Sequence, residues 1–280
     1  MKIAVFPDTC ARSGKPVMKA FIESLQGENI IICKNNERPD CDVVVMWSWL
    51  LGMYGRDSIY NHYKNKAKFL ILEVGGLKRN HAWRIGIGGI NRDAEFANEQ
   101  VDDKRLSLFN LEPYGWHNSE GEYIVICTQN PRSIAWDQGS IEQWCEKQIK
   151  WIRTHTDKKI LLRPHPRASV NLNKLVSNNV EISVPKFIGE HDHVDFDKLL
   201  GRADCVVNYN SNPAIESVLA GIPVYVDESS LCRPVGNAIG SDMIHARPDR
   251  SEWCKQISYC EWFVEEIQQG LPWKRLREKL

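Results

Sequence analysis

Hydrophobic and polar positions alternate along the first hundred residues with the periods of strands and helices. Four apolar runs have the length of buried strands: residues 3–6, 29–33, 42–47 and 68–73. Between them, the stretches 15–25 and 56–65 have the pattern of helices. Strands that alternate with helices predict a parallel, doubly wound α/β sheet. The glycine-rich stretches 73–79 and 85–91 are expected to be irregular.

The same alternation starts again near residue 122. It predicts strand 123–127, helix 141–154, strand 159–162, helix 172–177, extended pieces 180–182 and 187–188, and helix 196–202 with Asp195 as its N-cap. Residues from 251 onward are expected to be helical and amphipathic. We therefore divide the chain into an N-terminal lobe (1–118), a second lobe (119–250) and a C-terminal helix (251–280). A hinge is expected near 118–121.

The composition is that of a globular protein without a dominant charge. Of the 280 residues, 42% are hydrophobic and 26% are charged, and the net charge is zero. Contact with nucleic acid would therefore need a local basic patch. The nine cysteines include no C-x-x-C pair, which favours reduced, buried thiols over disulfides or a zinc site. No apolar stretch suits a signal peptide or a membrane span, so we expect a cytoplasmic protein.

Segment 205–226 combines a buried strand, a polar turn, a short helix and a second buried strand. Asn212 suits an N-cap, Pro213 suits the first helical position, and Gly221 suits a left-handed helix end. A helix N-terminus favours a bound phosphate, and Glu216 lies one turn further on the same face, where a carboxylate can accept hydrogen bonds from a sugar diol. An ordinary strand-turn-helix explains this segment equally well when it is taken alone.

Polar clusters follow three predicted strands of the second lobe. They are Gln129-Asn130, Arg163-Pro164-His165-Pro166-Arg167 and Asn210-Ser211-Asn212. Ligands of open α/β sheets bind at the carboxyl ends of strands, so we expect these clusters to converge there. Arginine and histidine suit phosphate oxygens, and the two prolines fix the loop. A solvated loop is the alternative.

These motifs resemble the donor-binding lobe of GT-B glycosyltransferases. The resemblance rests on Arg163-Pro164-His165-Pro166, on 199–204, on Asn210-Ser211 through Glu216, and on 221–224, and it covers residues 120–230 best. It is nearest to enzymes of the capsular-polysaccharide type and to phage enzymes that glycosylate DNA bases. The resemblance implies two Rossmann-like lobes with a cleft between them, a nucleotide-sugar in the cleft, and a C-terminal helix that crosses back to the first lobe.

The resemblance also implies roles for single residues. Arg163 and His165 would contact the diphosphate, with Gln129 and Arg167 beside them. Ser211 and Asn212 would cap the diphosphate, and Glu216 would hold the ribose. The expected donor is a nucleotide-sugar, with a UDP-sugar favoured, and no further cofactor.

The first lobe is expected to hold the acceptor and a catalytic base. Sugar transfer needs a group that takes the proton of the acceptor hydroxyl. The candidates are Asp8, Glu73, Asp93 and Glu95, of which we favour Glu73 and Asp93. For each of them, a turn-capping or salt-bridged carboxylate is the alternative.

The acceptor that we favour from the sequence is a 5-hydroxymethylpyrimidine in double-stranded DNA. Lys78, Arg79, Arg84 and Arg92 form a local basic cluster that suits a phosphate backbone. Trp83, Tyr114 and Trp116 are candidates for stacking on a base or a sugar. Three alternatives stay open: a glycosyltransferase for a capsule or another glycan, a nucleotide-sugar 2-epimerase, and a non-catalytic nucleotide-binding module. A phage-encoded enzyme of this kind would work in the host cytoplasm.

One histidine pair invites a metal site. His191 and His193 have H-x-H spacing, which points two side chains the same way on a strand. Spacing supplies no third ligand, so we expect a surface or nucleotide-contacting loop and no metal. The sugar, the stereochemistry and the oligomeric state do not follow from the sequence.

Overall fold

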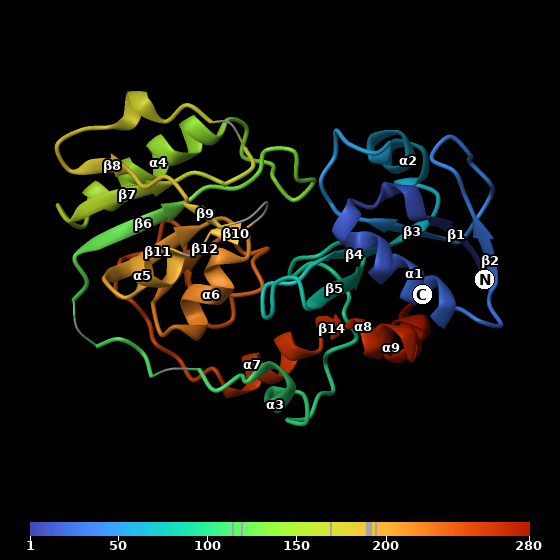
Figure 1. The fold of residues 1–280 in the computed structure, drawn as a ribbon. Helices are drawn as coiled ribbons and strands as arrows, with labels where there is room; N and C mark the ends of the chain where they lie inside the picture. The colour runs from blue at the N-terminus through green and yellow to red at the C-terminus, as the bar shows by residue number, and fades with distance from the viewer. Residues whose placement is uncertain (114, 119, 169, 189–191, 194) are drawn as a thin grey trace. The chain divides into compact units, whose positions relative to one another are not determined.

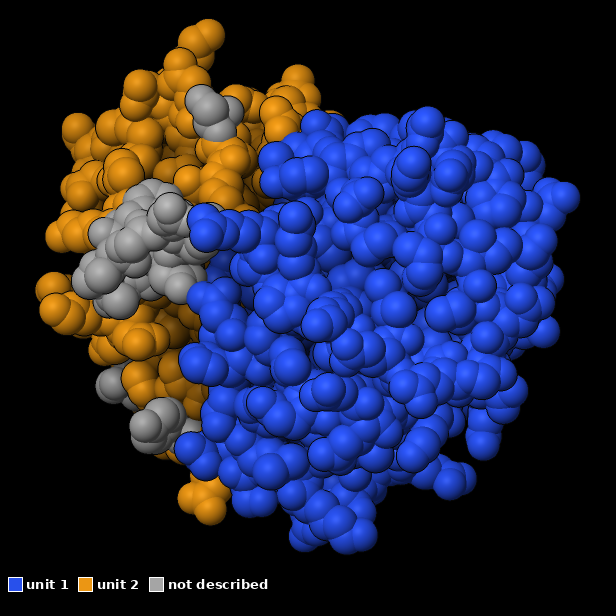
Figure 2. Space-filling model, turned by 45° about the vertical axis from the view of Figure 1, so that its right-hand side comes forward, with its two compact units in different colours: residues 1–111, 252–280 blue, residues 112–251 orange. Residues whose placement is uncertain are grey.

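The chain forms two compact units, which Figure 2 shows in different colours. Unit 1 comprises Met1–Leu111 and Glu252–Leu280, and unit 2 comprises Glu112–Ser251. The computed structural model describes residues 1–113, 115–118, 120–168, 170–188, 192–193 and 195–280. Each unit contains a six-stranded, mostly parallel sheet with helices, so the predicted α/β class with two Rossmann-like lobes is confirmed (Figure 1).

Unit 1 is built on a sheet with the strand order β14-β5-β4-β3-β1-β2. Its strands are β1 (Lys2–Phe6), β2 (Asn29–Ile32), β3 (Val43–Trp47), β4 (Lys68–Val74), β5 (Ala82–Ile87) and β14 (Glu261–Phe263). The first four run parallel, whereas β5 is antiparallel to β4, and β14 is antiparallel to β5. The parallel part matches the predicted strands to within one residue at either end.

Two predictions for unit 1 are wrong. The glycine-rich region was expected to be irregular, yet Ala82–Ile87 forms the fully buried strand β5. Its Gly86 is a close-packing position, because a Cβ there would lie 2.7 Å from the Gly89 carbonyl oxygen and from the Phe96 ring. The residues after 251 were expected to be helical throughout, yet β14 interrupts them. A three-residue strand between helices leaves no alternation long enough to detect.

The helices of unit 1 include segments from both ends of the chain. They are α1 (Lys15–Ser24), α2 (Arg56–Tyr63), α3 (Leu106–Phe109), α7 (Ser251–Ser258), α8 (Val264–Gln268) and α9 (Leu271–Leu276), with 3₁₀ turns at Pro7–Thr9, Arg12–Gly14 and Arg277–Lys279. Phe21 of α1 and Trp273 of α9 pack edge to face, 6.3 Å apart, in one core. The C-terminal segment thus completes the core of unit 1.

Unit 2 is built on a second parallel sheet, ordered β13-β12-β11-β6-β7-β8. Its strands are β6 (Tyr123–Cys127), β7 (Lys159–Arg163), β8 (Val180–Ile182), β11 (Ala203–Asn208), β12 (Val224–Val226) and β13 (Asn237–Ala238), and β9 (Phe187–Ile188) pairs with β10 (Asp192–His193) separately. The helices are α4 (Ile141–Arg153), α5 (Phe196–Leu200) and α6 (Pro213–Leu219). The Ser140 hydroxyl caps α4 by accepting from the Gln143 backbone N–H at 3.1 Å.

Two local predictions for unit 2 are wrong. The expected helix 172–177 is only a 3₁₀ turn, Asn173–Leu175. The side chain of Asn171 accepts a hydrogen bond from the Asn173 backbone, which favours a turn over a helix. The Asp195 side chain does not cap α5, because its carboxylate binds Arg163 instead.

Glycine in the expected hinge has a packing role. A Cβ on Gly121 would lie 2.1 Å from the Asp204 backbone nitrogen, and the Gly121 N–H donates to the Asp204 carboxylate at 2.9 Å. This segment therefore needs a glycine for close approach to β11. A hinge at this place stays a prediction.

Candidate functional site

The polar clusters of unit 2 meet at the carboxyl edge of its sheet, as predicted. Cys127 at the end of β6 pairs with Arg163 of β7 on one side and with Asn208 of β11 on the other. Gln129, His165 and Asn210 each follow two residues after these paired positions. Because neighbouring parallel strands lie about 4.8 Å apart, the three segments leave the sheet side by side.

Arg163 forms a buried ion pair at this edge. Its guanidinium donates to both Asp195 carboxylate oxygens, at 2.6 and 3.2 Å, and to the Ser183 hydroxyl at 3.3 Å. Only 4% of Arg163 is exposed. The hydrogen bonds from Arg163 lower the pKa of the Asp195 carboxyl. Arg163 therefore joins β7 to the start of α5 in this structure, and diphosphate binding by its guanidinium stays a prediction.

The loop after β7 is held by its own hydrogen bonds. The His165 backbone N–H donates to the Thr128 hydroxyl at 2.8 Å, which ties this loop to the end of β6. His165 Nδ1 accepts from the Arg167 backbone N–H at 3.1 Å, so a neutral ring carries its proton on Nε2. Arg167 is exposed. Nε2 is thereby set as a donor, as phosphate binding would require.

The turn before α6 differs from the prediction. Asn212 has helical dihedral angles, φ −53° and ψ −31°, and its side chain makes no capping hydrogen bond. Asn212 therefore occupies the predicted N-cap position without a side-chain cap, because a capping side chain needs an extended backbone to reach the following N–H groups. The Asn208 side chain instead accepts from the Ser211 backbone at 2.9 Å and donates to its hydroxyl at 2.8 Å. Pro213 begins the helix, and Gly221 has the expected positive φ, 82°.

Glu216 lies half-buried on α6, near the end of β6. Burial raises the pKa of the Cys127 thiol to about 12; the charge of Arg163 opposes this rise and that of Glu216 adds to it. Both charges thus act on the same thiol at the carboxyl edge. Helix α6 has only seven residues, so its dipole is short.

Two buried amide oxygens at this edge lack a hydrogen-bond partner among the described residues. They are Gln129 Oε1 and Asn210 Oδ1, on side chains that are 5% and 6% exposed. Nδ2 of Asn210 donates to the Ala135 carbonyl and the Ser229 hydroxyl, which fixes the orientation of that amide. Buried acceptors are nearly always paired in folded proteins. The sequence placed Asn210 in one of the polar clusters expected at this edge, but we gave it no individual role.

Unit 1 also gathers polar groups at the carboxyl edge of its sheet. Glu73, on β4, accepts from the Ser48 hydroxyl at 2.7 Å and from the Val74 backbone N–H at 2.9 Å. Ser48 follows β3 with φ 68°, a conformation that is costly for a residue with a side chain. Glu73 is therefore held in a fixed position at this edge, as its predicted role requires.

Arg56 is the buried cation of the same edge. Only 3% of it is exposed, and its guanidinium donates to the Thr9 carbonyl at 2.7 and 3.0 Å and to the Leu50 carbonyl at 3.0 Å. Burial lowers the pKa of Arg56, while the negative charge of Glu73 raises it. Arg56 thus supplies a positive charge near the predicted base. We did not identify it from the sequence, where it appeared only as the start of a helix.

The other candidate bases have different surroundings, although Asp8 follows β1 at the same carboxyl edge. Asp8 is exposed in the 3₁₀ turn after β1, and Asp93 is exposed in a turn after β5. Glu95 accepts from the Ala97 backbone N–H at 2.5 Å, which is the turn-capping alternative. Among the four candidates, Glu73 has the most ordered surroundings.

The predicted nucleic-acid cluster includes residues with internal partners. Arg84 is 3% exposed and donates to the Glu261 carboxylate at 2.7 Å, so its position does not suit a DNA phosphate. Glu261 also accepts from the Gly76 and Leu77 backbone N–H groups at 2.6 and 2.9 Å. The Lys78 ammonium donates to the Leu108 carbonyl at 2.7 Å. Arg79 is half-buried and Arg92 is exposed.

The aromatic candidates are also accounted for. Trp83 is buried in β5 and Trp116 donates its indole N–H to the Pro248 carbonyl, while Tyr114 lies outside the described residues. Trp116 also lies against the Arg250 guanidinium, 3.9 Å from its ring centre.

A possible metal-ligand cluster lies at the opposite edge of the unit 2 sheet. Asp204, Cys205 and His245 have ligand atoms within 4.8 Å of one another. Burial raises the pKa of the Cys205 thiol well above its usual value, so this group stays protonated. His245 Nε2 bonds to Asp204 at 3.1 Å, and Lys158 pairs with Asp204 at 2.9 Å. These atoms satisfy one another without a metal. His191 lies outside the described residues.

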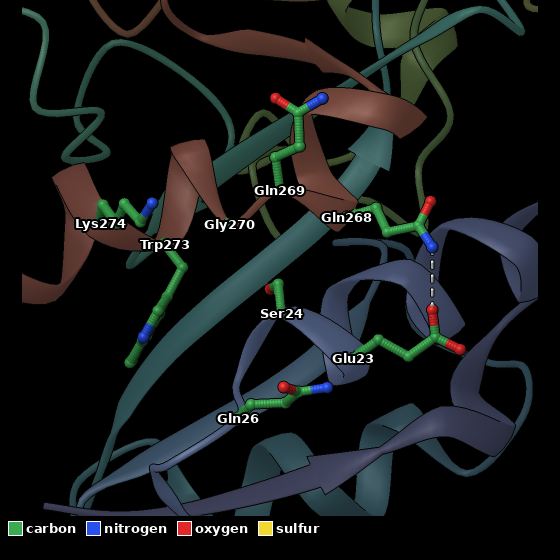
Figure 3. A pocket seen from close by; sticks show the side chains of 8 residues that line it. All are labelled: Glu23, Ser24, Gln26, Gln268, Gln269, Gly270, Trp273 and Lys274. Atoms are coloured by element: carbon green, nitrogen blue, oxygen red, sulfur yellow. Dashed lines mark hydrogen bonds between the residues drawn. The ribbon is translucent and has the colours of Figure 1, made fainter.

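A polar groove of about 560 Å³ lies on unit 1 between the end of α1 and the α8–α9 turn. Figure 3 shows the side chains that line it, among them Glu23, Gln268, Gln269 and Lys274. Gln268 donates to Glu23 at 3.4 Å across the groove. Because α1 begins at the carboxyl edge and the groove is at its far end, the groove lies away from Glu73.

Two solved structures with a similar fold are described as Kdo transferases. The chain is similar to a Thermosulfurimonas dismutans structure described as "KpsC, beta Kdo 2,7 transferase", with a TM-score of 0.56, 14% identity, and coverage of 98% of this chain and 100% of that one. The chain is also similar to the same organism's "KpsC, beta Kdo 2,4 transferase", with a TM-score of 0.56 and 12% identity. This match covers 96% of this chain and 98% of that one. No protein-family model and no curated protein matches the sequence. The fold is therefore of the two-lobe GT-B type, as the resemblance implied.

None of the helices in the described part of the chain has the length and apolar character to cross a bilayer. All nine cysteines are free, and eight of them are buried, as expected for reduced thiols.

Proposed function

We propose that this protein transfers a sugar from a nucleotide-sugar to a hydroxyl of a glycan acceptor. Unit 2 would hold the donor at the carboxyl edge of its sheet, and Glu73 of unit 1 would be the base. In the transfer, the acceptor hydroxyl gives its proton to the carboxylate and bonds to the anomeric carbon. The bond from that carbon to the phosphate oxygen breaks, and the nucleotide leaves.

The proposal rests on the buried amide oxygens of Gln129 and Asn210, for which the described part of the chain offers no hydrogen-bond partner. They lie on neighbouring segments of the edge where open α/β sheets bind ligands. An unpaired buried acceptor costs stability, so its presence favours a ligand with O–H or N–H donors. Nucleotide-sugars carry both. The GT-B fold also supports the assignment, although on its own it identifies no activity.

The acceptor proposed here differs from the DNA that we favoured from the sequence. Arg84 is internal and the Lys78 ammonium binds a carbonyl, which leaves a much weaker basic cluster for a phosphate backbone. Glu73 adds negative charge at the proposed acceptor edge. A neutral, hydroxyl-rich acceptor suits these surroundings better than a polyanion does.

Nucleotide binding tests the donor site. The full chain is screened by thermal shift with UDP, GDP, CMP and their sugar conjugates. A ligand at a hundredfold its Kd stabilises the protein by about 2.7 kcal/mol. We expect one nucleotide to raise the Tm of the wild type. The same nucleotide should not raise the Tm of Glu216→Ala. Glu142→Ala, which changes a half-buried glutamate on α4, is the matched control. The absence of a shift with every nucleotide would contradict the proposal.

Product analysis tests the reaction. The donor that binds is incubated alone, with oligosaccharides, and with duplex DNA that contains hydroxymethylcytosine. A new glycosidic product with an oligosaccharide supports the proposal. Glycosylated DNA would instead support the acceptor favoured from the sequence, an altered donor sugar without acceptor would indicate an epimerase, and binding without turnover would indicate a nucleotide-binding module.

A further inference from the structure

The loop that follows β3 contains two residues in a costly conformation. Ser48 and Tyr54 have φ values of 68° and 56°, in the left-handed region where side chains are disfavoured. A bulky tyrosine is a rare occupant of this region, and glycine would adopt it freely, as Gly55 does with φ 70°. We call residues 48–55 the β3 loop. The backbone conformation of Tyr54 costs stability, and such a cost points to a function of the Tyr54 side chain.

Hydrogen bonds hold the β3 loop along its length. Arg56 donates to the Leu50 carbonyl at 3.0 Å, and the Gly52 N–H donates to the Asp57 carboxylate at 2.6 Å. The Asn35 amide donates to the Tyr54 carbonyl at 2.7 Å. The loop is thus anchored at its start, middle and end, and its exposed side chains stand on an ordered backbone.

The loop presents two large apolar side chains to solvent. Met53 is 48% exposed and Tyr54 is 45% exposed. The Arg56 guanidinium lies over the Tyr54 ring, 5.1 Å from its centre, and backs it with a buried cation. Two side chains make a patch too small for a protein interface, which needs hundreds of Å² on each partner. Their size suits a single ring of a ligand.

Polar groups near Tyr54 favour a hydroxyl-bearing ring. Oδ1 of Asn35 is buried and has no partner among the described residues, and its orientation is fixed because Nδ2 of the same amide binds the Tyr54 carbonyl. Glu73 accepts hydrogen bonds from the Ser48 hydroxyl at 2.7 Å and from the Trp49 backbone N–H at 3.4 Å, so the carboxylate lies against the β3 loop. Amide and carboxylate oxygens accept hydrogen bonds from hydroxyls, and a carboxylate repels phosphate.

We infer that the β3 loop is a saccharide-binding subsite, in which Tyr54 stacks on the ring of the acceptor sugar. This inference rests on the proposed function, because it places the acceptor beside Glu73. The apolar C–H face of the sugar would cover the Tyr54 ring, and a ring hydroxyl would donate to Asn35 Oδ1. The substrate class is a neutral glycan.

Glycan binding by point variants tests this subsite. The full-length wild type, Tyr54→Ala and Tyr54→Phe are compared on an oligosaccharide array and by titration with the best-bound glycan. We expect Tyr54→Ala to weaken binding about tenfold, which is the size of one ring contact, and Tyr54→Phe to keep it within about twofold. Leu108→Ala, at a similarly exposed position of unit 1, is the control and should bind as the wild type does.

A stability measurement separates a binding role from a structural one. Tyr54→Gly removes the strained conformation, so we expect it to leave the Tm equal or higher while glycan binding falls as in Tyr54→Ala. Three outcomes would overturn the inference: a wild type that binds no glycan, a Tyr54→Ala variant that binds as tightly as the wild type, or binding of hydroxymethylcytosine duplex DNA without any glycan.

The two proposals fail in different ways. Sugar transfer to a glycan that is unchanged in Tyr54→Ala would overturn the subsite and leave the proposed function in place. Glycan binding that depends on Tyr54, in a protein that binds no nucleotide and transfers no sugar, would overturn the proposed function and support the subsite.

Discussion

The carboxyl edges of the two sheets are built in contrasting ways. In unit 1, Arg56 donates three hydrogen bonds to carbonyl groups, and Glu73 is held by a hydroxyl and a backbone N–H. In unit 2, one ion pair, Arg163 with Asp195, is complete, yet two buried amide oxygens have no partner among the described residues. Both edges satisfy their charged groups internally, but among the described residues unit 1 has one buried amide oxygen without a partner, on Asn35 after β2, whereas unit 2 has two such oxygens at the end of its central strands.

This difference separates positioning from binding. A group that must act on a substrate atom benefits from a fixed orientation, which the contacts of Glu73 supply. Groups that bind a ligand lack hydrogen-bond partners when the ligand is absent, and this lowers the stability of the free protein. The contrast therefore predicts opposite responses: substitutions in the saturated contacts should destabilise, and substitutions of the unpaired oxygens should stabilise.

The largest effect is expected from Arg163→Ala. Removal of Arg163 leaves the mostly buried Asp195 carboxylate without a cationic partner, which should lower the free energy of unfolding by about 4 kcal/mol. Urea unfolding followed by circular dichroism measures it. The exposed Arg167→Ala is the control and should stay within about 0.5 kcal/mol of the wild type. If Arg163→Ala and Arg167→Ala unfolded at the same urea concentration, the ion pair would contribute nothing to the stability of the protein.

Arg56→Met should have the next largest effect. The substitution removes the hydrogen bonds that the charged guanidinium donates to the Thr9 and Leu50 carbonyls. We therefore expect the free energy of unfolding to fall by about 3 kcal/mol. Tryptophan fluorescence during urea unfolding reports it, with the exposed Arg12→Met as control. We also expect faster proteolysis in the β3 loop, because Arg56 anchors Leu50. Unchanged proteolysis would contradict the anchoring role.

Gln129→Met should act in the opposite direction. Methionine has a similar length and no polar group, so the unpaired oxygen disappears and stability should rise by about 1 kcal/mol. The same variant should lose the thermal shift caused by the nucleotide that the wild type binds. Gln143→Met, exposed on α4, should change neither. Destabilisation by Gln129→Met would show that the amide is satisfied in solution and would remove the contrast between the edges.

The smallest effect concerns acid. The pKa of Asp195 is lowered from its usual 3.8 by the hydrogen bonds from Arg163. The ion pair therefore stabilises the fold fully above about pH 4, and this contribution is lost as the pH falls through the lower pKa of the folded state. In Asp195→Asn that loss should be absent, so its stability should depend less on pH below 4. Acid titrations followed by circular dichroism compare the two proteins, and identical acid dependence would contradict this assignment.

The sequence predicted the parallel core better than its edges. The spacing of apolar residues predicts the buried parallel strands of both sheets. The parallel direction of β6, β7 and β11 then brings the polar clusters that follow them to one edge. The strands β5 and β14 were missed, because glycines resembled turn signals and three residues carry no period. The partners of Arg163 and Arg84 depend on residues distant in sequence, Asp195 and Glu261, which no local pattern connects.

The return of residues 252–280 to unit 1 sets an order of events on the ribosome. Glu261 neutralises the buried Arg84, and β14 covers the edge of β5, yet both are synthesised after the whole of unit 2. A nascent unit 1 therefore exposes an unpaired strand edge and a buried cation without its anion while unit 2 folds. Chaperone binding during synthesis should concentrate on β5 and end once Glu261 has emerged.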